Sequence, residues 1–91
     1  MEDYKLHTIL FDKNKNSLPD VIQFILKHNY KIKKIHEQKN FYRVRQLSKE
    51  QLKKTGYDDY RTVIVDPKKN IQLILGYKRK INNKVKFIFL R

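Results

Sequence analysis

The stretch YRTVIVDPKKNIQLILGY, residues 60–77, carries the clearest structural signal in this chain. Its two halves, residues 60–65 and 71–77, are rich in the β-branched, aromatic and aliphatic side chains that favour β-strands. Residues 66–70 between them start with Asp-Pro and continue with lysine and asparagine, a composition typical of a solvent-exposed turn. The stretch therefore predicts a β-hairpin, and a hairpin predicts an antiparallel sheet.

Further strands are predicted on both sides of the hairpin. Residues 30–36 are ambiguous, because Ile32 and Ile35 are three residues apart and also suit a continued helix. The turn-like residues 38–40 that follow favour a strand there instead. The predicted strands outside the hairpin cover residues 4–11, 30–36, 41–46 and 84–90.

Two helices are predicted from capping signals. Ser17 is a suitable N-cap, and Asp20 stands at the capping-box position three residues later. The helix that follows covers residues 18–28 and places its aliphatic side chains on one face. Ser48 repeats the capping signal before a short helix that ends at Gly56.

The predicted order of elements is β-α-β-β-α-β-β-β, in one domain over residues 1–91. This order defines an α+β fold, a small single domain in which two helices pack on an antiparallel sheet. The first six elements have the order of ferredoxin-like folds. The second helix is short for that fold, so a ferredoxin-like arrangement is one candidate within the wider class.

The charge of the chain is the main indication of function. Twenty-two Lys and Arg oppose nine Asp and Glu, which gives a formal net charge of +13. Solubility does not require such an excess, because balanced charges also serve, so the excess points to an anionic partner. It lies in residues 27–54 and 78–91, two basic blocks on an otherwise balanced chain. Nucleic acid is the first partner class to consider, because its phosphate backbone binds Lys and Arg.

The strand over residues 41–46 gives the sharpest hypothesis for a binding surface. Alternation places Phe41, Arg43 and Arg45 on one face of the sheet and the two residues between them on the other. If the latter face the core, the outer face offers an aromatic ring for stacking and two guanidinium groups for phosphates. The alternative is an ordinary sheet face whose arginines pair with carboxylates such as those of residues 58–59.

Two lysine-rich runs, residues 31–34 and 78–80, have the composition of phosphate-contacting segments, although lysine also protects exposed strand edges. Such contacts position a protein on nucleic acid without reading its sequence. The predicted nucleic-acid-binding residues are Lys31, Lys33, Lys34, Lys39, Phe41, Arg43, Arg45, Lys78, Arg79 and Lys80.

Residues 39–46 lie where an RNA-recognition motif carries the signature of its third strand. The similarity is partial, because Asn40 stands where the motif has Gly, and Arg43 and Gln46 stand where it has aromatic residues. We therefore do not predict that motif.

No catalytic or metal-binding motif is present in the sequence. The chain has no cysteine, its three histidines lack ligand spacing, and its two glycines are too far apart for a phosphate-binding loop. A nuclease-like set of carboxylates would need Asp58 and Asp66, which a six-residue strand holds roughly 20 Å apart. The sequence therefore predicts a non-enzymatic protein with no cofactor, no catalytic residue and no metal site.

The leading prediction is a small nucleic-acid-binding protein that contacts the phosphate backbone of DNA or RNA with little sequence specificity. The alternative is a protein–protein interaction module, such as an inhibitor, adaptor or virion component, that docks on an acidic partner. Exposed strands such as residues 84–90 add a homodimer as a further option.

The expected location is intracellular, in the cytoplasm or nucleus, or associated with a virion. No apolar stretch of the sequence is long enough to span a membrane, so no membrane partner is expected. The bias toward Lys, Ile, Asn and Tyr is common in AT-rich genomes, including those of many phages and large DNA viruses. That bias bears on source and not on function.

Overall fold

The computed structural model describes residues 3–78, which form five strands and two helices. The predicted strand over residues 84–90 lies outside the described residues. The α+β class is confirmed, with a five-stranded antiparallel sheet and two helices. The elements are β1 (Tyr4–Asp12), α1 (Leu18–Lys27), β2 (Ile35–Glu37), β3 (Phe41–Arg45), α2 (Lys49–Thr55), β4 (Asp59–Asp66) and β5 (Ile71–Tyr77).

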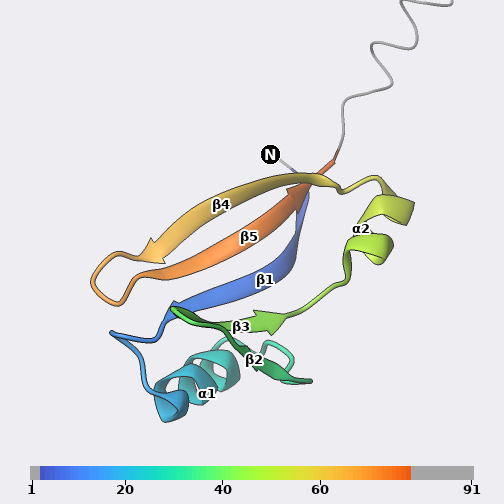
Figure 1. Cartoon of the computed structure of the whole chain (residues 1–91). Helices are drawn as coiled ribbons and strands as arrows, with labels where there is room; N and C mark the ends of the chain where they lie inside the picture. The colour runs from blue at the N-terminus through green and yellow to red at the C-terminus, as the bar shows by residue number, and fades with distance from the viewer. Residues whose placement is uncertain (1–2, 79–91) are drawn as a thin grey trace, which may run out of the picture.

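The strands of the sheet follow the order β2-β3-β1-β5-β4, and every neighbouring pair is antiparallel (Figure 1). Because β1 and β2 are both antiparallel to β3, they run parallel to each other with β3 between them. This is the split β-α-β unit of ferredoxin-like folds. The second half of the chain differs from that fold, since α2 leads to the outer strand β4 and β5 then returns beside β1. The ferredoxin-like likeness is therefore limited to β1, α1, β2 and β3.

Helix α1 covers one face of the sheet and forms the main core with it. Val21 and Ile25 of the helix are fully buried against Ile9 and Phe11 of β1. The ring of Phe11 packs edge-on against Phe24, with centroids 5.3 Å apart. Burial of these aliphatic and aromatic side chains supplies most of the favourable free energy of folding in such a domain.

Helix α2 packs against the opposite face of the sheet, near the end of β5. Gly76 of β5 is on that face, because side chains alternate along a strand and Leu73 packs on the α1 side. A Cβ atom on Gly76 would lie 2.3 Å from the carbonyl oxygen of Tyr57 and 3.4 Å from Leu52 Cδ1. The absence of a side chain at Gly76 therefore lets α2 and the residue after its cap approach the sheet.

The capping signals are confirmed at both helices. Ser17 and Asp20 form a reciprocal capping box at α1, and Ser48 and Gln51 form another at α2. Gly56 ends α2 with a φ of 84°, in the left-handed region where glycine meets no steric penalty. Local hydrogen bonds within three residues explain why the sequence alone predicts these helix ends.

The predicted strand over residues 30–36 is mostly wrong, because β2 begins only at Ile35. The side-chain amide of Gln46 explains the difference. It accepts a hydrogen bond from the backbone N–H of Lys31 and donates one to the carbonyl of Lys31, both at 2.8 Å. The side chain therefore occupies both backbone groups of Lys31, which a strand ladder would use, and β2 starts only after a loop at residues 31–34.

Candidate nucleic-acid interface

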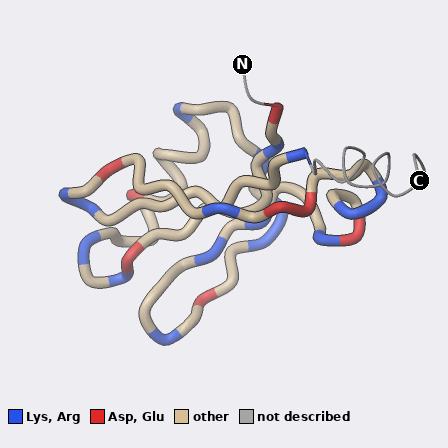
Figure 2. The backbone as a smooth tube through the Cα atoms, turned by 90° about the horizontal axis from the view of Figure 1, so that it is seen from above, with Lys and Arg blue, Asp and Glu red and all other residues tan. Residues whose placement is uncertain are grey.

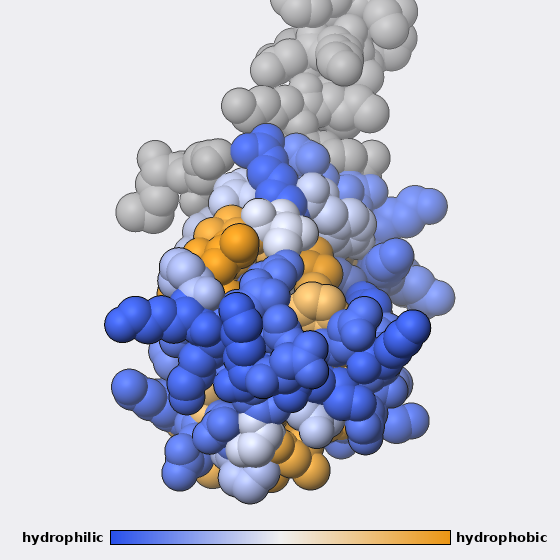
Figure 3. Space-filling view, turned by 60° about the vertical axis from the view of Figure 1, so that its left-hand side comes forward, coloured by the Kyte–Doolittle hydropathy of each residue, from blue (hydrophilic) through white to orange (hydrophobic). Residues whose placement is uncertain are grey.

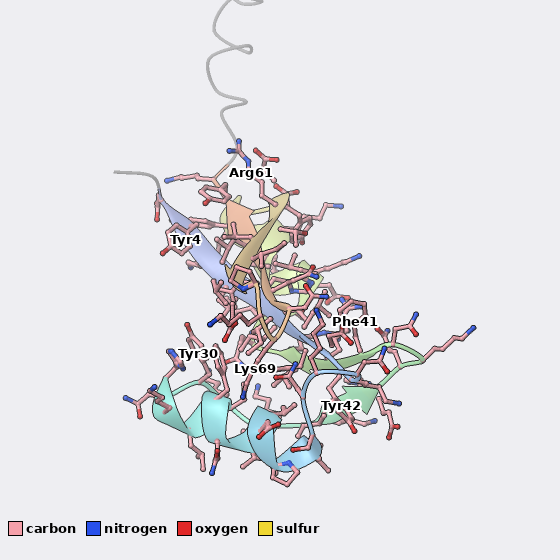
Figure 4. The ribbon with its side chains drawn as sticks, turned by 90° about the vertical axis from the view of Figure 1, so that its left-hand side faces the viewer. Tyr4, Tyr30, Phe41, Tyr42, Arg61 and Lys69 are labelled. Atoms are coloured by element: carbon pink, nitrogen blue, oxygen red, sulfur yellow. The ribbon has the colours of Figure 1, made fainter. Side chains whose placement is uncertain are left out.

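Strand β3 presents its two sets of side chains to opposite faces, as its alternation predicts. Val44 is fully buried in the α1 core and Tyr42 packs against that core. Tyr42 lies on the side toward α1 and Phe41 on the other side (Figure 4). Phe41, Arg43 and Arg45 therefore share the face that α1 leaves uncovered. On that face Arg45 is exposed, while Phe41 and Arg43 are half-buried.

The arginines of β3 do not form the ion pairs that the alternative interpretation requires. Within residues 3–78, the two ion pairs join Lys13 to Glu37 at 2.5 Å and Arg61 to Asp59 at 3.4 Å. Asp59 thus pairs on its own strand, not with β3. No carboxylate of the described residues lies at salt-bridge distance from Arg43 or Arg45.

A cavity of about 180 Å³ lies where the 31–34 loop, β2, β3 and the start of α2 meet. None of its lining residues is acidic, and its basic members come from three separate segments. Side chains from the loop and from β3 converge here although they are more than ten residues apart in sequence. The lining residues are Lys33, Lys34, His36, Arg45, Gln46, Ser48 and Gln51.

The polar side chains of this cavity are already engaged, and the basic ones are not. Gln46 bonds the backbone of Lys31, and Ser48 and Gln51 bond each other's backbone across the first turn of α2. Within residues 3–78, the charged groups of Lys33, Lys34 and Arg45 have neither an ion pair nor a side-chain hydrogen bond. These three groups are therefore the ones that a ligand in the cavity would contact.

The pKa of His7 reflects both its burial and the positive charge near this site. Its ring is 2% exposed, and its Nδ1 lies 2.6 Å from the carbonyl oxygen of Leu47, which fits an N–H donor at that nitrogen. Burial lowers the pKa of His7 below the ordinary value of 6.5, and the positive charges of Arg43, Arg45 and Lys49 lower it further, while the bond to Leu47 acts in the opposite sense. Burial and these positive charges thus both disfavour protonation of the His7 ring.

The remaining predicted residues are not gathered at the cavity. Lys39 is exposed in the turn between β2 and β3, and Phe41 lies at the far end of β3, opposite Asp12. Lys78 follows β5, with its ammonium 6.0 Å from the centroid of the Tyr57 ring. Arg79 and Lys80 lie outside the described residues. The structure therefore brings together Lys33, Lys34 and Arg45, with Lys31 and Arg43 adjoining them.

Sequence reasoning missed four of the cavity's residues, namely His36, Gln46, Ser48 and Gln51. His36 lies opposite Arg43 in the pairing of β2 with β3, a register that the sequence does not state. The serine and glutamine of α2 are predictable as a capping box but not as neighbours of Arg45. Their place in the site follows from the chain folding back after β3.

Charge alone does not define this site. Basic positions occur on strands, helices and loops around the molecule, with acidic positions between them (Figure 2). The cavity brings Lys33, Lys34 and Arg45 into one hollow whose lining includes no carboxylate. Such convergence concentrates positive potential more than the same charges spread over a convex surface.

A metal site, a nuclease-like carboxylate pair and a membrane span each require a specific arrangement of residues. Within residues 3–78, no three His, Asp or Glu side chains gather in a way that could hold a metal ion. Asp59 and Asp66 stand at opposite ends of β4, roughly 23 Å apart at the usual strand rise. Neither helix of that part of the chain has the length and apolar character needed to cross a bilayer.

Comparisons with protein-family models, with curated proteins and with solved structures give no match to this chain.

Proposed function

We propose that this protein binds nucleic acid without catalysing a reaction, and that it does so by contacting backbone phosphates. The observation that carries the proposal is the cavity lined by Lys33, Lys34 and Arg45, whose charged groups have no carboxylate partner among the described residues. A folded chain with a net charge of +13 gains most from a polyanion that neutralises several of these groups at once.

The chemistry of the three groups suits a phosphate. The planar guanidinium of Arg45 can donate two parallel hydrogen bonds to a pair of phosphate oxygens. The ammonium groups of Lys33 and Lys34 act as mobile point charges on a loop and can follow neighbouring phosphates. Arg43 in β3 and Lys49 at the start of α2 add further positive charge next to residues of the site.

Sequence-specific reading of a duplex is not part of the proposal. The seven residues of α2 form about two turns and border the cavity, whereas groove-reading helices in helix-turn-helix proteins lie beside a second supporting helix. Contacts limited to phosphates position a protein but do not distinguish bases. Binding with little sequence preference is therefore expected, to DNA, RNA or both.

The proposal is tested by fluorescence anisotropy with labelled single- and double-stranded DNA and RNA, at low and at physiological salt. Binding is expected to weaken steeply as salt rises, because each neutralised phosphate releases a counterion. No binding to any of the four ligands at physiological salt would overturn the proposal.

A matched pair of triple variants locates the site. The variant Lys33→Ala, Lys34→Ala, Arg45→Ala removes three charges at the cavity. The control Lys15→Ala, Lys27→Ala, Lys68→Ala removes three charges from exposed positions elsewhere. We expect the cavity variant to bind roughly tenfold or more weakly and to lose about three from the salt slope. Equal losses in both variants would show that only total charge matters.

Docking on an acidic protein is the second candidate, and one observation favours it. Phe41 and Arg43 are half-buried, and Arg43 Nε is enclosed without a hydrogen-bond partner among the described residues. Because the Phe41 ring is half-buried, it offers less aromatic surface for base stacking than an exposed ring would. If all four nucleic acids fail to bind, an acidic protein partner becomes the leading candidate.

A further inference from the structure

Strand β4 forms an outer edge of the sheet that residues 3–78 build. Its eight residues pair with β5 on one side, and no strand among residues 3–78 pairs with the other side. All side chains from Asp59 to Val65 are exposed, including Val63 at 40%, Ile64 at 56% and Val65 at 45%. Figure 3 shows apolar patches within the hydrophilic surface on the side of the molecule that carries the β4–β5 turn.

This edge lacks the usual protection against pairing with another chain. Natural edge strands are commonly short, or carry lysine or proline, or are interrupted by a bulge in mid-strand. β4 contains neither lysine nor proline, and its one register shift lies near its end, between Ile64 and Asp66. Its single cation, Arg61, is held by Asp59 and lies 4.8 Å above the ring of Tyr77.

We propose that β4 pairs antiparallel with β4 of a second copy of this chain, so that the two sheets continue into one. Main-chain hydrogen bonds would join the open N–H and C=O groups, as in other cases of strand addition. Val63 of each copy would lie beside Val63 of the other on one face, and Ile64 would lie beside Thr62 of the other copy on the opposite face. The pairing is isologous, because both copies use the same patch about a two-fold axis.

The charge along β4 favours a second copy over a different partner. The strand carries Asp59, Arg61 and Asp66, a formal charge of −1 in a chain of +13. Two like molecules repel each other least where their basic residues are absent. The opposite edge, β2, follows a loop that bears Lys31, Lys33 and Lys34, and two copies would meet strong repulsion there.

The two ends of β4 are also complementary to each other. The strand starts next to Asp58 and Asp59, and it ends in a turn that carries the exposed Lys68 and Lys69. Antiparallel pairing brings the start of one strand beside the end of its partner. A two-fold axis at Val63 would put the acidic start of each strand near the lysine-bearing turn of the other. The charges at the two ends therefore suit a pair centred on Val63.

The first test is sedimentation equilibrium on the nucleic-acid-free full chain over a range of protein concentrations. A monomer–dimer equilibrium is expected, and Val63→Lys should weaken it about tenfold or more, since it places two like charges at the centre of the pair. The control Gln38→Lys adds the same charge at the other edge and should weaken it less than twofold. Circular dichroism checks that both variants fold.

Two results of that test would overturn the proposal. One is a wild-type chain that stays monomeric at every concentration. The other is an equal weakening by Gln38→Lys, which would assign the effect to net charge. Because nucleic acid is absent from the experiment, its result does not depend on whether the proposed binding function is correct.

A cross-linking test checks the register. The chain has no cysteine, so a single Val63→Cys substitution introduces the only thiol. Under mild oxidation, Val63→Cys should form a disulfide-linked dimer much faster than Gln38→Cys. Equal rates would indicate random collision and would overturn pairing through β4.

Discussion

The two edges of this sheet differ in length, in charge and in what surrounds them. β2 has three residues, and its Glu37 is bonded by Lys13 from the loop after β1. β4 has eight residues, an apolar stretch in its second half and no lysine. The first edge adjoins the cationic cavity and presents side-chain charge, whereas the second presents main-chain hydrogen-bonding groups. One small sheet thus has two chemically different edges, and the two proposals assign a different partner to each.

The largest expected effect is a loss of stability on substitution in the core between β1 and α1, because that core supports both edges of the sheet. Phe11 lies on the central strand β1, is fully buried, and packs against α1. Phe11→Ala should lower the free energy of unfolding by about 3–5 kcal/mol, measured by urea denaturation, because it removes a large side chain and leaves a cavity. Both edges should then lose function together.

The exposed Leu26→Ala on the same helix provides the control for Phe11→Ala. Leu26 is 63% exposed, so its truncation should change stability by no more than about 0.5 kcal/mol. A similar loss in both variants would mean that α1 does not pack on β1 through the face described.

Gly76→Ala should weaken the attachment of α2 to the sheet. The new methyl group would meet the carbonyl oxygen of Tyr57, a backbone atom that cannot rotate away. A loss of about 1–3 kcal/mol in the free energy of unfolding is expected, as for other overpacked sites. Because α2 borders the cavity, nucleic-acid binding should fall as well, while self-association through β4 should not. Unchanged stability would contradict the close approach of Tyr57 to β5.

Most of the fold could be predicted from the sequence because its signals are local. The hairpin of β4 and β5 and the capping boxes at Ser17 and Ser48 depend on residues close together in the chain. The loop at residues 31–34 could not be predicted, since the Gln46 side chain that holds Lys31 comes from fifteen residues away. The face taken by α2 depends on Gly76, which is twenty residues beyond its C-cap.

The site could be predicted only in part for the same reason. Alternation in β3 placed Arg45 on an open face, and composition marked Lys33 and Lys34 as candidates. Neither alternation nor composition predicts that the 31–34 loop and β3 converge in one cavity. Nor does either predict that Phe41 and Lys78 lie away from it. Those facts depend on strand register and on the course of the chain after β3.

Ser48→Ala and Ser17→Ala form a matched pair that sharpens the assignment of the cavity. Each removes one capping box, so each should cost about 1 kcal/mol of stability. Only Ser48 lines the cavity, so only Ser48→Ala should also weaken nucleic-acid binding, measured by anisotropy at fixed salt. Equal binding by the two variants would indicate that α2 supports the fold without contributing to the site.

The smallest effect concerns the protonation of His7. Because burial and the nearby cations lower its pKa in the folded state, the unfolded chain takes up a proton at a higher pH than the native protein does. The stability present above pH 6.5 should therefore be lost progressively as the pH falls from 6.5 toward the folded pKa. Urea denaturation at a series of pH values measures this loss, and His7→Gln should reduce it.

The pKa of His7 should respond more to a change at the cavity than to a change at the β4 edge. Arg45→Gln removes one of the cations that lower the pKa of His7, so this pKa should rise toward its ordinary value when followed by NMR of the imidazole. Val63→Lys should change it less, because alternation puts Val63 on the face of β4 opposite Tyr60, whose ring lies 5.3 Å from that of His7. Bound nucleic acid should raise it in the wild type, since phosphates would offset the charge of Arg45. A pKa that responds to none of these changes would mean that burial alone sets it, and that the cationic potential at the cavity is too weak to favour phosphate.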